Sequence, residues 1–592
     1  MSHPAPPRGD VPPEPDDPEA QSVAETQPIP PPGAEEDETL LMPRPAEGAA
    51  PAASTGGARS GAIASAMVAA GIFLSRIAGL VRTSLLARFL GTSIYADVFN
   101  AALRMPNFIQ NLLGEGTLSA SFIPVYAELL HQGKKEEAGR VAGAIFSLLM
   151  ACAGALALAG ILLAPALTSL FLPGFEGERR ELTIHITRIL FPMTGVLVLS
   201  AWSLGILNSH RYFFLSYFAP VLWNVAMIAA LFLFGRELSA DRLVVALSWA
   251  ALIGGGLQLA VQLPGVLRLE RQLKIRWDLK LAGVREAVRN AGPAVMGRGV
   301  VQISSWVDTI LASLLAAGAV AVFQYATTLY VLPVSLFGMS VAAAELPELA
   351  RQRTSGSEVL RARAAGGLER IAFYVVPSFV AFVALGDVIV GGLFQHGEFS
   401  RGDTLLVYVT LLGFAAGLMA TTSSRLLSST FFALRDTKTP ARYATVRVVL
   451  SVVLGVVFML QFESVSLGSL TLPAGVFGDV RLEGKTLGVF GLTFAAGVAA
   501  WVENILLKRA LRERIGKVAP RHSAVLRMYA AAFLGAAAGW GVRFLLPEVS
   551  PLVEAFPVLG AFGVVYFAAA AALGLEQSGA VFRRVRQMVL RR

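Results

Sequence analysis

The chain has 592 residues, of which 55% are hydrophobic and only 15% are charged, and its mean hydropathy is +0.61. Soluble globular proteins are about 45–50% apolar and about 25% charged, so this composition excludes a soluble protein and indicates an α-helical protein that crosses a membrane many times. Cys152 is the only cysteine, which excludes a disulfide framework and a cysteine-based zinc site.

The first sixty residues differ in composition from the rest of the chain. Residues 1–60 hold 11 Asp and Glu, 3 Lys and Arg and 14 Pro, with few large apolar side chains. Such a segment cannot bury enough apolar surface to fold, so we expect a disordered, acidic, Pro-rich N-terminal tail. The remaining residues carry 47 Lys and Arg against 30 Asp and Glu.

Long apolar runs recur from about residue 61 to the end of the chain. A helix needs about 20 apolar residues to cross a hydrocarbon layer of about 30 Å. Fourteen runs fit this length, near 63–90, 95–113, 141–172, 183–207, 212–235, 242–265, 291–317, 319–346, 368–394, 403–432, 442–461, 486–507, 523–546 and 552–575. We therefore expect an all-α polytopic membrane protein with about fourteen transmembrane helices.

The loops between these spans differ in charge. Counted from the N-terminus, the even-numbered loops and the C-terminal end hold more than four times as many Lys and Arg as the odd-numbered loops. Basic loops stay on the cytoplasmic side, so we expect both termini in the cytoplasm, as an even number of spans requires. This asymmetry explains the sequence pI of about 9.8 without a nucleic-acid partner.

The chain contains an internal repeat. The stretch LLARFLGTSIYADVFNAALRMP (85–106) matches ASLLAAGAVAVFQYATTLYVLP (312–333) in layout. Each copy joins two apolar helices through a short turn, at Gly91 and Gly318 respectively, and each ends in proline. The equal spacing predicts two structurally related halves of like orientation.

We expect this repeat to organise the membrane region into two six-helix lobes, at 61–284 and 285–510. Residues 511–592 then supply two additional helices and a basic cytoplasmic tail. Repeats of like orientation place the substrate site at the repeat interface near the bilayer midplane, so a central cavity is expected between the lobes.

Ionisable residues inside the spans indicate function. Each costs about 2.5–3.5 kcal/mol at a helix centre, so each requires a polar cavity or a partner. The first lobe holds Arg76, Arg82 and Arg88 in its first span, and Asp97 and Arg104 in its second. Three or more arginines with one aspartate leave positive charge uncompensated, and guanidinium forks bind phosphate oxygens in a bidentate way. The alternative for Arg88 and Arg104 is that they extend to the membrane interfaces.

The second lobe lacks a matching cluster at the repeat offset. To its spans we assign Arg298 and Asp308, which are ten residues apart on one helix and too far apart to pair directly. Asp308 and Glu503 are the intramembrane carboxylates that could bind a co-transported cation. The alternative for Glu503 is an ion pair or an interfacial position.

Several stretches together resemble the MurJ/MviN lipid II flippases of the multidrug/oligosaccharidyl-lipid/polysaccharide exporter superfamily. The opening stretch from SRIAGLVRTSLLARFLG to FIPVYAELL is similar to the family's first signature. The matching stretches are 75–130, FAPVLWNVAMI (218–228), GPAVMGRGVVQIS (292–304), LFQHGEFS (393–400) and FFALRDTKTPARYA (431–444). They follow the family's order over about 61–510.

The resemblance implies fourteen helices around a central cavity, and export of the undecaprenyl-pyrophosphate-linked peptidoglycan precursor. The residues that match the family's required arginines and aspartate are Arg76, Arg82 and Asp97. Glu115 matches an acidic residue at the cytoplasmic end of the second helix. We expect no catalytic residue and no cofactor, and a bacterial cytoplasmic (inner) membrane location.

The chain departs from the family at two places. Gln110 and Asn111 stand where many relatives carry a further arginine, and Thr327 and Thr328 replace an Asp-Arg pair of the eighth helix. One positive charge expected from the second lobe is therefore missing. Our hypothesis is that Arg298 of the neighbouring helix supplies it.

The resemblance predicts an alternating-access mechanism with lipid II as the substrate. Arg76 and Arg82, with Arg104 and Arg298 as further candidates, would hold the diphosphate while the polyprenyl tail stays in lipid. The last two helices, with the small-residue stretch GAAAGWG (535–541), would associate with this tail. The membrane potential or a coupling cation would drive transport, and cell-wall synthesis proteins are candidate partners.

Three other functions are compatible with a polytopic membrane protein. One is a scaffold without transport activity, in which Arg76 and Arg82 could be replaced without loss of function. The others are another exporter and a membrane enzyme. A different exporter of the same superfamily would move drugs or another polyprenyl-diphosphate-linked glycan; the arginines argue against cationic drugs but not against another glycan. A membrane glycosyl- or phosphotransferase needs paired carboxylates or a metal site. The adjacent acidic residues lie in the N-terminal tail or, at Glu136 and Glu137, in a Lys-flanked loop, which argues against an enzyme.

Overall fold

The computed structural model describes residues 57–579 except 272, 468 and 479. At 57–69, 115, 297–305 and 354 it describes the backbone alone. Every described residue belongs to one compact unit. The predicted N-terminal tail lies outside the described residues up to residue 56.

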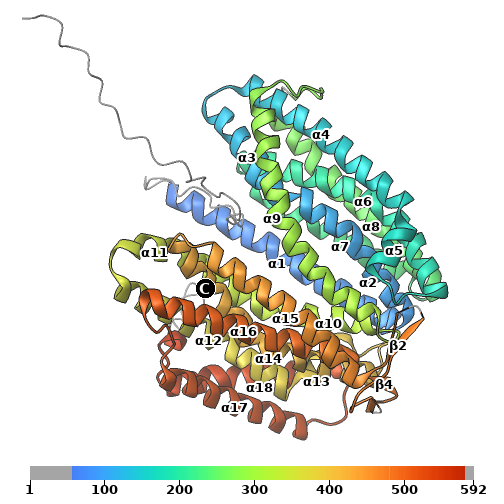
Figure 1. The fold of residues 1–592 in the computed structure, drawn as a ribbon, viewed down its shortest axis with the longest axis vertical. Coiled ribbons are helices and arrows are strands. Elements are labelled where there is room, and N and C mark those ends of the chain that lie inside the picture. Colours follow the sequence, from blue (N-terminus) through green and yellow to red (C-terminus); the bar gives the residue numbers. More distant parts are fainter. Residues whose placement is uncertain (1–56, 272, 468, 479, 580–592) are drawn as a thin grey trace, which may run out of the picture. The chain divides into compact units, whose positions relative to one another are not determined.

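The described part of the chain is built from long helices that follow one another through short turns (Figure 1). The first nine are α1 (Gly57–Leu90), α2 (Ile94–Leu113), α3 (Glu115–His131), α4 (Lys135–Leu162), α5 (Ala164–Phe171), α6 (Gly177–Ser209), α7 (Phe213–Phe234), α8 (Ala240–Leu269) and α9 (Ala282–Ser313). The others are α10 (Ala319–Pro333), the π-helix η1 (Val334–Met339), α11 (Ser340–Arg351), the short 3₁₀ helix η2 (Gln352–Thr354), α12 (Ser357–Ala384), α13 (Gly386–Phe394), α14 (Arg401–Ala433), α15 (Lys438–Phe462), α16 (Gly488–Ile515), α17 (His522–Leu545) and α18 (Pro551–Ala572).

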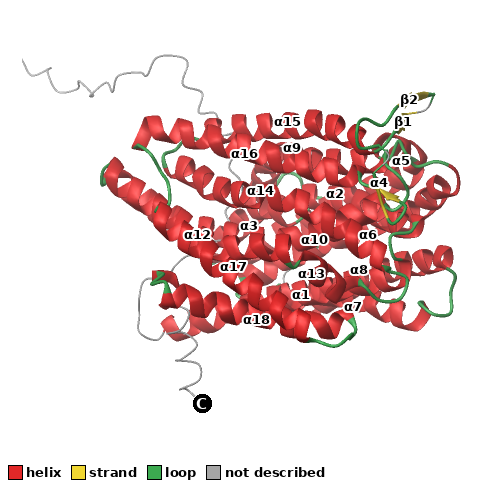
Figure 2. Cartoon of the chain, turned by 90° about the horizontal axis from the view of Figure 1, so that it is seen from below, coloured by secondary structure: helices red, strands yellow, loops and turns green. Residues whose placement is uncertain are grey.

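Strand structure in the described residues is confined to two short hairpins between α15 and α16, shown in yellow in Figure 2. Strands β1 (Val465–Leu467) and β2 (Leu470–Leu472) pair antiparallel, as do β3 (Arg481–Leu482) and β4 (Lys485–Thr486). Hydropathy does not predict these strands in the Gly-rich segment.

The fold class expected from hydropathy is confirmed. Each of the fourteen predicted spans coincides with one described helix or with two or three consecutive helical segments. Twelve helical segments in the described part of the chain are long and apolar enough to cross a membrane. The other two expected spans are α2, which carries Asp97 and Arg104, and α9, which begins with the polar stretch AGVREAVRN; their charges lower the hydropathy of each helix.

Helix α3 was not expected. Its buried residues recur every three to four positions, so one face packs inward, with Phe122 and Tyr126 fully buried. Around them lies a core cluster that includes Val284 and Ala287 from the first turns of α9. The helix is too short and too polar on its other face to have been detected as a span.

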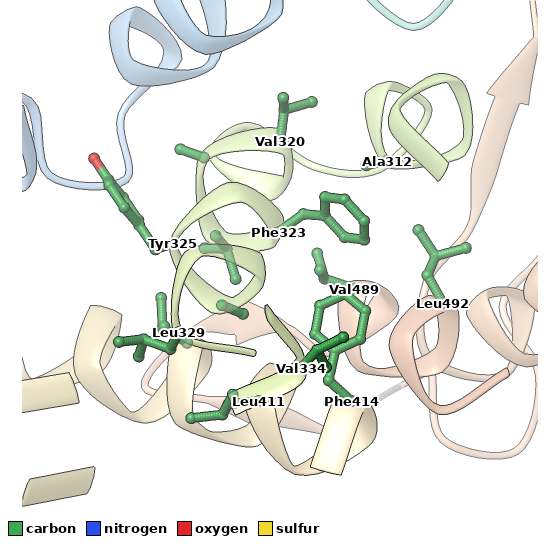
Figure 3. Packing of buried hydrophobic residues seen from close by; sticks show 14 of the residues in the cluster. Ala312, Val320, Phe323, Tyr325, Leu329, Val334, Leu411, Phe414, Val489 and Leu492 are labelled. Atoms are coloured by element: carbon green, nitrogen blue, oxygen red, sulfur yellow. The ribbon is translucent and has the colours of Figure 1, made fainter. Parts of the chain in front are cut away.

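The largest hydrophobic core runs from α1 to α16. Figure 3 shows its packing around α10, where Phe323 lies against Phe414 of α14, with ring centroids 5.5 Å apart. A second cluster joins α17 and α18 to α12 and α13. The main direct contacts between the helices before α9 and those after it are α2 with α10 and α1 with α13.

Both glycine turns of the repeat have a positive φ angle. Gly91 has φ +55° and Gly318 has φ +92°, a region that residues with a Cβ rarely adopt. A Cβ at Gly318 would lie 2.2 Å from the carbonyl oxygen of Thr92, and one at Gly91 would lie 2.7 Å from that of Glu398. Each turn therefore needs glycine twice over, for its φ angle and for its close contact with the other half of the chain.

Candidate functional site

Arg76 and Arg82 both lie on α1 without an ion-pair partner among the described side chains. The Arg76 side chain is exposed, and its Nη1 donates to Ser335 Oγ of η1 at 2.9 Å. The Arg82 guanidinium carbon lies 4.9 Å from the ring centroid of Trp223 on α7, and its Nε is buried with no hydrogen-bond partner. Both guanidinium groups thus retain donors that an anion could satisfy.

Asp97 lies in a different environment from these arginines. Its side chain is fully buried in the first turn of α2, where Oδ2 pairs with Arg179 Nη2 of α6 at 2.5 Å. The backbone N–H of Gly318 donates to Oδ2 at 2.6 Å, and that of Ala321 donates to Oδ1 at 2.7 Å. Asp97 therefore caps the N-terminus of α10, where helical N–H groups lack intrahelical partners and the macrodipole favours negative charge.

Further polar contacts join the chain halves near the Asp97 cap. Thr92 donates its hydroxyl to Asp403 at the start of α14, and Lys485 of the β3–β4 hairpin forms an ion pair with the same carboxylate. Lys485 Nζ also donates to Thr92 Oγ1 at 2.8 Å. Tyr325 OH of α10 donates to the Gly91 carbonyl oxygen at 2.9 Å. We call this group of contacts around Gly91 and Gly318 the glycine-turn seal.

Arg104 and Asp308 face each other from α2 and α9. The Arg104 guanidinium carbon lies 5.9 Å from the ring centroid of Trp306, and Asp308 is within electrostatic range of both Arg104 and Arg447. The carboxylate of Asp308 thus lies between a cation of the first half and one of the second. Opposite charges within a few ångströms stabilise each other strongly where water is scarce.

Glu503 forms an ion pair, which is the alternative that the sequence left open for it. Its Oε2 lies 3.1 Å from Arg447 Nη1 of α15, and its side chain is 8% exposed. Arg425 of α14 and Tyr330 of α10 are within electrostatic range of this pair. The sequence analysis missed Arg425 and Arg447, although both lie inside predicted spans and the criterion applied to the first lobe would have found them.

Two predicted site residues lie outside the described side chains. Glu115 and Arg298 belong to α3 and α9, but only their backbone is described, so the Arg298 hypothesis stays a prediction. The threonines at the expected eighth-helix pair bond to their own helix: Thr327 donates to the Phe323 carbonyl oxygen at 2.7 Å and Thr328 to that of Gln324 at 2.8 Å.

An apolar cavity of about 360 Å³ lies between α10, η1, α12, α13 and α18. Its lining includes Leu336, Phe337, Pro377, Phe562 and Gly563. The walls are almost entirely hydrocarbon, so the cavity suits an apolar chain rather than a polar headgroup.

The small residues of 535–541 do not line this cavity. A Cβ at Gly535 would lie 2.8 Å from the Phe562 carbonyl oxygen, and one at Gly539 would lie 3.0 Å from Leu385. These glycines therefore allow α17 to pack closely on α18 and on the end of α12. The expected small-residue groove is a packing interface at these two positions.

The described residues inside the membrane-length helices supply positively charged arginine side chains that could bind a ligand. Arg76, Arg82, Arg104, Arg425 and Arg447 lie inside membrane-length helices, against the two carboxylates of Asp308 and Glu503. Within the described ranges, no group of three or more His, Cys, Asp or Glu side chains could hold a metal ion. The arrangement offers donors that can bind an anion.

Comparisons with known proteins agree on one family. A family model described as "Lipid II flippase MurJ" matches residues 86–556. The probable lipid II flippase MurJ of Rhizobium tropici is 35% identical over 391 residues, covering 64% of this chain and 72% of that protein. The lipid II flippase MurJ of Burkholderia cenocepacia is 31% identical over 448 residues, covering 74% and 82% respectively.

Solved structures show the same fold. A lipid II flippase MurJ in an inward closed conformation superposes with a TM-score of 0.67 at 21% identity, covering 86% of this chain and 99% of that one. A multidrug resistance MATE family transporter of the MOP superfamily, in an inward-facing conformation, gives a TM-score of 0.57 at 17% identity, covering 74% and 96%.

Proposed function

The chain belongs to the MurJ family of lipid II flippases, and from that premise we propose that it moves lipid II from the cytoplasmic to the outer leaflet by alternating access. The observation that carries the proposal is the pair of α1 arginines, Arg76 and Arg82, which have no ion-pair partner among the described side chains. A diphosphate supplies the oxygens that such guanidinium groups lack. Binding and release of the headgroup require no bond to be made or broken, so we infer a transporter without enzymatic activity.

The direction of transport follows from the proposed orientation. Basic loops favour the cytoplasm, so we infer that both termini lie on that side and that the Gly91 and Gly318 turns lie at the outer surface. The glycine-turn seal would then close the outer side while the headgroup of lipid II reaches Arg76 and Arg82 from the cytoplasm. Breaking the Asp97 contacts with α10 is the step that we assign to outward opening.

We assign the polyprenyl tail to the apolar cavity bounded by α12 and α18. Its almost wholly hydrocarbon lining supports this assignment, and its position beside η1 places it next to Ser335, the partner of Arg76. The tail could therefore stay in an apolar environment while the diphosphate binds to α1. Burial of each CH₂ contributes about 0.8 kcal/mol.

Two sources of energy fit the arrangement. Moving negative charge outward is favoured by the membrane potential, by about 2.3 kcal/mol per charge per 100 mV. A co-transported cation is the alternative, with Asp308 as its binding group because the Glu503 carboxylate already pairs with Arg447. An interaction with cell-wall synthesis proteins of the bacterial inner membrane stays a prediction.

The test is complementation of bacteria depleted of their own flippase. We expect the chain to restore growth and to lower the amount of lipid II that accumulates in the cytoplasmic leaflet. Normal expression with continued lysis and accumulation of lipid II would contradict the proposed function. Rescue of an unrelated lipid-linked glycan pathway, with no effect on peptidoglycan, would instead support the other exporter.

A further inference from the structure

Arg425 is an exposed cation on an otherwise enclosed helix. About two-thirds of the apolar part of α14 is buried. The side chains of Ser424 and Leu426, on either side of Arg425 in the sequence, are both buried. The Arg425 side chain is nevertheless exposed and forms no ion pair with any described side chain. The Arg425 side chain therefore lies where a charged ligand can reach it.

The surroundings of Arg425 come from three other helices. Tyr330 of α10, Arg447 of α15 and Glu503 of α16 all lie within its electrostatic range. Glu503 is engaged by Arg447, at 3.1 Å. Asp308 is within electrostatic range of Arg447 and also of Arg104. Three guanidinium groups thus face two carboxylates, which leaves one positive charge uncompensated.

The Arg447–Glu503 pair beside Arg425 lies at the level of Arg76. Arg76 precedes Gly91 by 15 residues, Arg447 precedes the end of α15 by 15, and Glu503 follows the start of α16 by 15. At about 1.5 Å per residue, each lies about 22 Å from the end of its helix at the glycine turns. Those ends meet, because Glu463 accepts a hydrogen bond from the Ala316 backbone N–H at 2.5 Å, two residues before Gly318.

Arg82 lies nearer the glycine turns than this group. It is nine residues before Gly91, which corresponds to about 13 Å. A diphosphate that approaches from the opposite end would therefore reach the level of Arg76 and of the Arg447–Glu503 pair before it reaches Arg82.

We propose that Arg425, with Arg447 beside it, forms a second lipid-phosphate site, contributed by the C-terminal half of the chain, which takes the diphosphate before it passes to Arg82. The inference deepens the proposed function and rests on it. It also assigns the positive charge of the second half to a described side chain, independently of Arg298. The ligand chemistry is a phosphate group carried by a lipid, and the substrate diphosphate and a phospholipid headgroup are its two sources.

The test uses the full-length protein in phosphatidylcholine nanodiscs, with undecaprenyl diphosphate as the probe and phosphatidylglycerol as the comparison lipid. Loss of a charge-assisted contact predicts that Arg425→Ala weakens undecaprenyl diphosphate binding about tenfold or more. Arg425→Lys keeps the charge but loses the planar guanidinium fork, so its affinity should lie between that of the wild type and that of Arg425→Ala. Arg442→Ala, an exposed arginine at the start of α15, is the matched control and should bind like the wild type.

Two results would overturn this site. One is unchanged affinity of Arg425→Ala for undecaprenyl diphosphate. The other is that Arg425→Ala weakens binding of phosphatidylglycerol but not of undecaprenyl diphosphate. Arg425 would then contact headgroups of the surrounding bilayer. If the wild type binds undecaprenyl diphosphate and rescues depleted cells, either result refutes the Arg425 site and leaves the proposed function intact. If the wild type neither binds this probe nor rescues the cells, the proposed function itself is refuted.

Discussion

Asp97 and Gly318, which are 221 residues apart in the sequence, are joined by a hydrogen bond of 2.6 Å from the Gly318 backbone N–H to the Asp97 carboxylate. The same carboxylate accepts the N–H of Ala321 and pairs with Arg179, so one buried side chain links α2, α6 and α10. The two hydrogen bonds to α10 cross between the halves of the chain. We therefore expect the glycine-turn seal to depend on Asp97.

Asp97→Asn should open the glycine-turn seal. The substitution removes the charge that Arg179 and the α10 N-terminus require, and breaking a buried ion pair in this way costs about 3–5 kcal/mol. Spin labels at the exposed residues Glu181 and Ala317, in a variant with Cys152 replaced, would report the separation of α6 from the α9–α10 turn. We expect a longer mean distance than in the parent.

Glu237→Gln is the control for this measurement, because Glu237 is an exposed carboxylate in the turn after α7. It should leave the distance distribution unchanged. An unchanged distribution in Asp97→Asn as well would show that the seal does not depend on this carboxylate.

Lys485→Ala should weaken the same seal to a smaller extent. The Lys485 side chain is 40% exposed, so its pairing with Asp403 and Thr92 is partly screened by solvent. We expect the open distance population to rise less than in Asp97→Asn. Arg481→Ala, on the same hairpin, should match the wild type; equal effects of both variants would attribute the change to the hairpin as a whole.

Much of the fold could be predicted from the sequence because hydropathy and span length are local properties. The fourteen spans, the glycine turns and the arginines of α1 are all visible in short windows. The partner of Asp97 is not, since neither Arg179 nor the α10 N-terminus is near it in the sequence. Arg425 differs from Arg179: it lies inside a predicted span, as Asp308 and Glu503 do, but its proximity to Arg447 and Glu503 cannot be predicted from the sequence.

Gly563→Leu should impair transport by filling the apolar cavity. Gly563 lines this cavity, and a Cβ there meets no atom within 4 Å, so the larger side chain can enter without a clash at its first carbon. If the cavity holds the polyprenyl tail, lipid II transport should fall about tenfold or more while expression and thermal stability are retained.

Gly560→Leu provides a matched control on the same helix. A Cβ at Gly560 also meets no atom within 4 Å, but this glycine does not line the cavity. Its transport should equal that of the wild type. Equal transport by both leucine variants would show that the polyprenyl tail does not occupy this cavity.

Asp436, in the turn between α14 and α15, should make stability depend on acidity. Burial opposes ionisation of Asp436, but hydrogen bonds from Thr439 and the ion pair with Arg514 at 2.6 Å outweigh it and hold its pKa below the ordinary value of 3.8. A folded-state pKa below the unfolded value means that this contribution is complete above about pH 4 and is lost as the pH falls through the folded pKa.

The thermal midpoint of Asp436→Asn should therefore lie below that of the wild type at pH 7, and the gap should narrow as the pH falls below 4. Asp278→Asn, in the exposed loop before α9, should show no such gap. A gap between Asp436→Asn and the wild type that is constant from pH 7 to pH 3 would mean that ionisation of Asp436 contributes nothing to stability.

The most direct test of the account is the appearance of lipid II in the outer leaflet of flippase-depleted cells that express either the wild type or Arg82→Ala. Arg82 has a buried donor without a hydrogen-bond partner and no described counter-charge, so its loss should remove the anion contact on which transport depends. We predict that the wild type exposes lipid II to an externally added lipid II-cleaving toxin, that Arg82→Ala at equal membrane abundance does not, and that Arg82→Lys is intermediate. Full exposure of lipid II by Arg82→Ala would contradict the claim that this guanidinium holds the substrate.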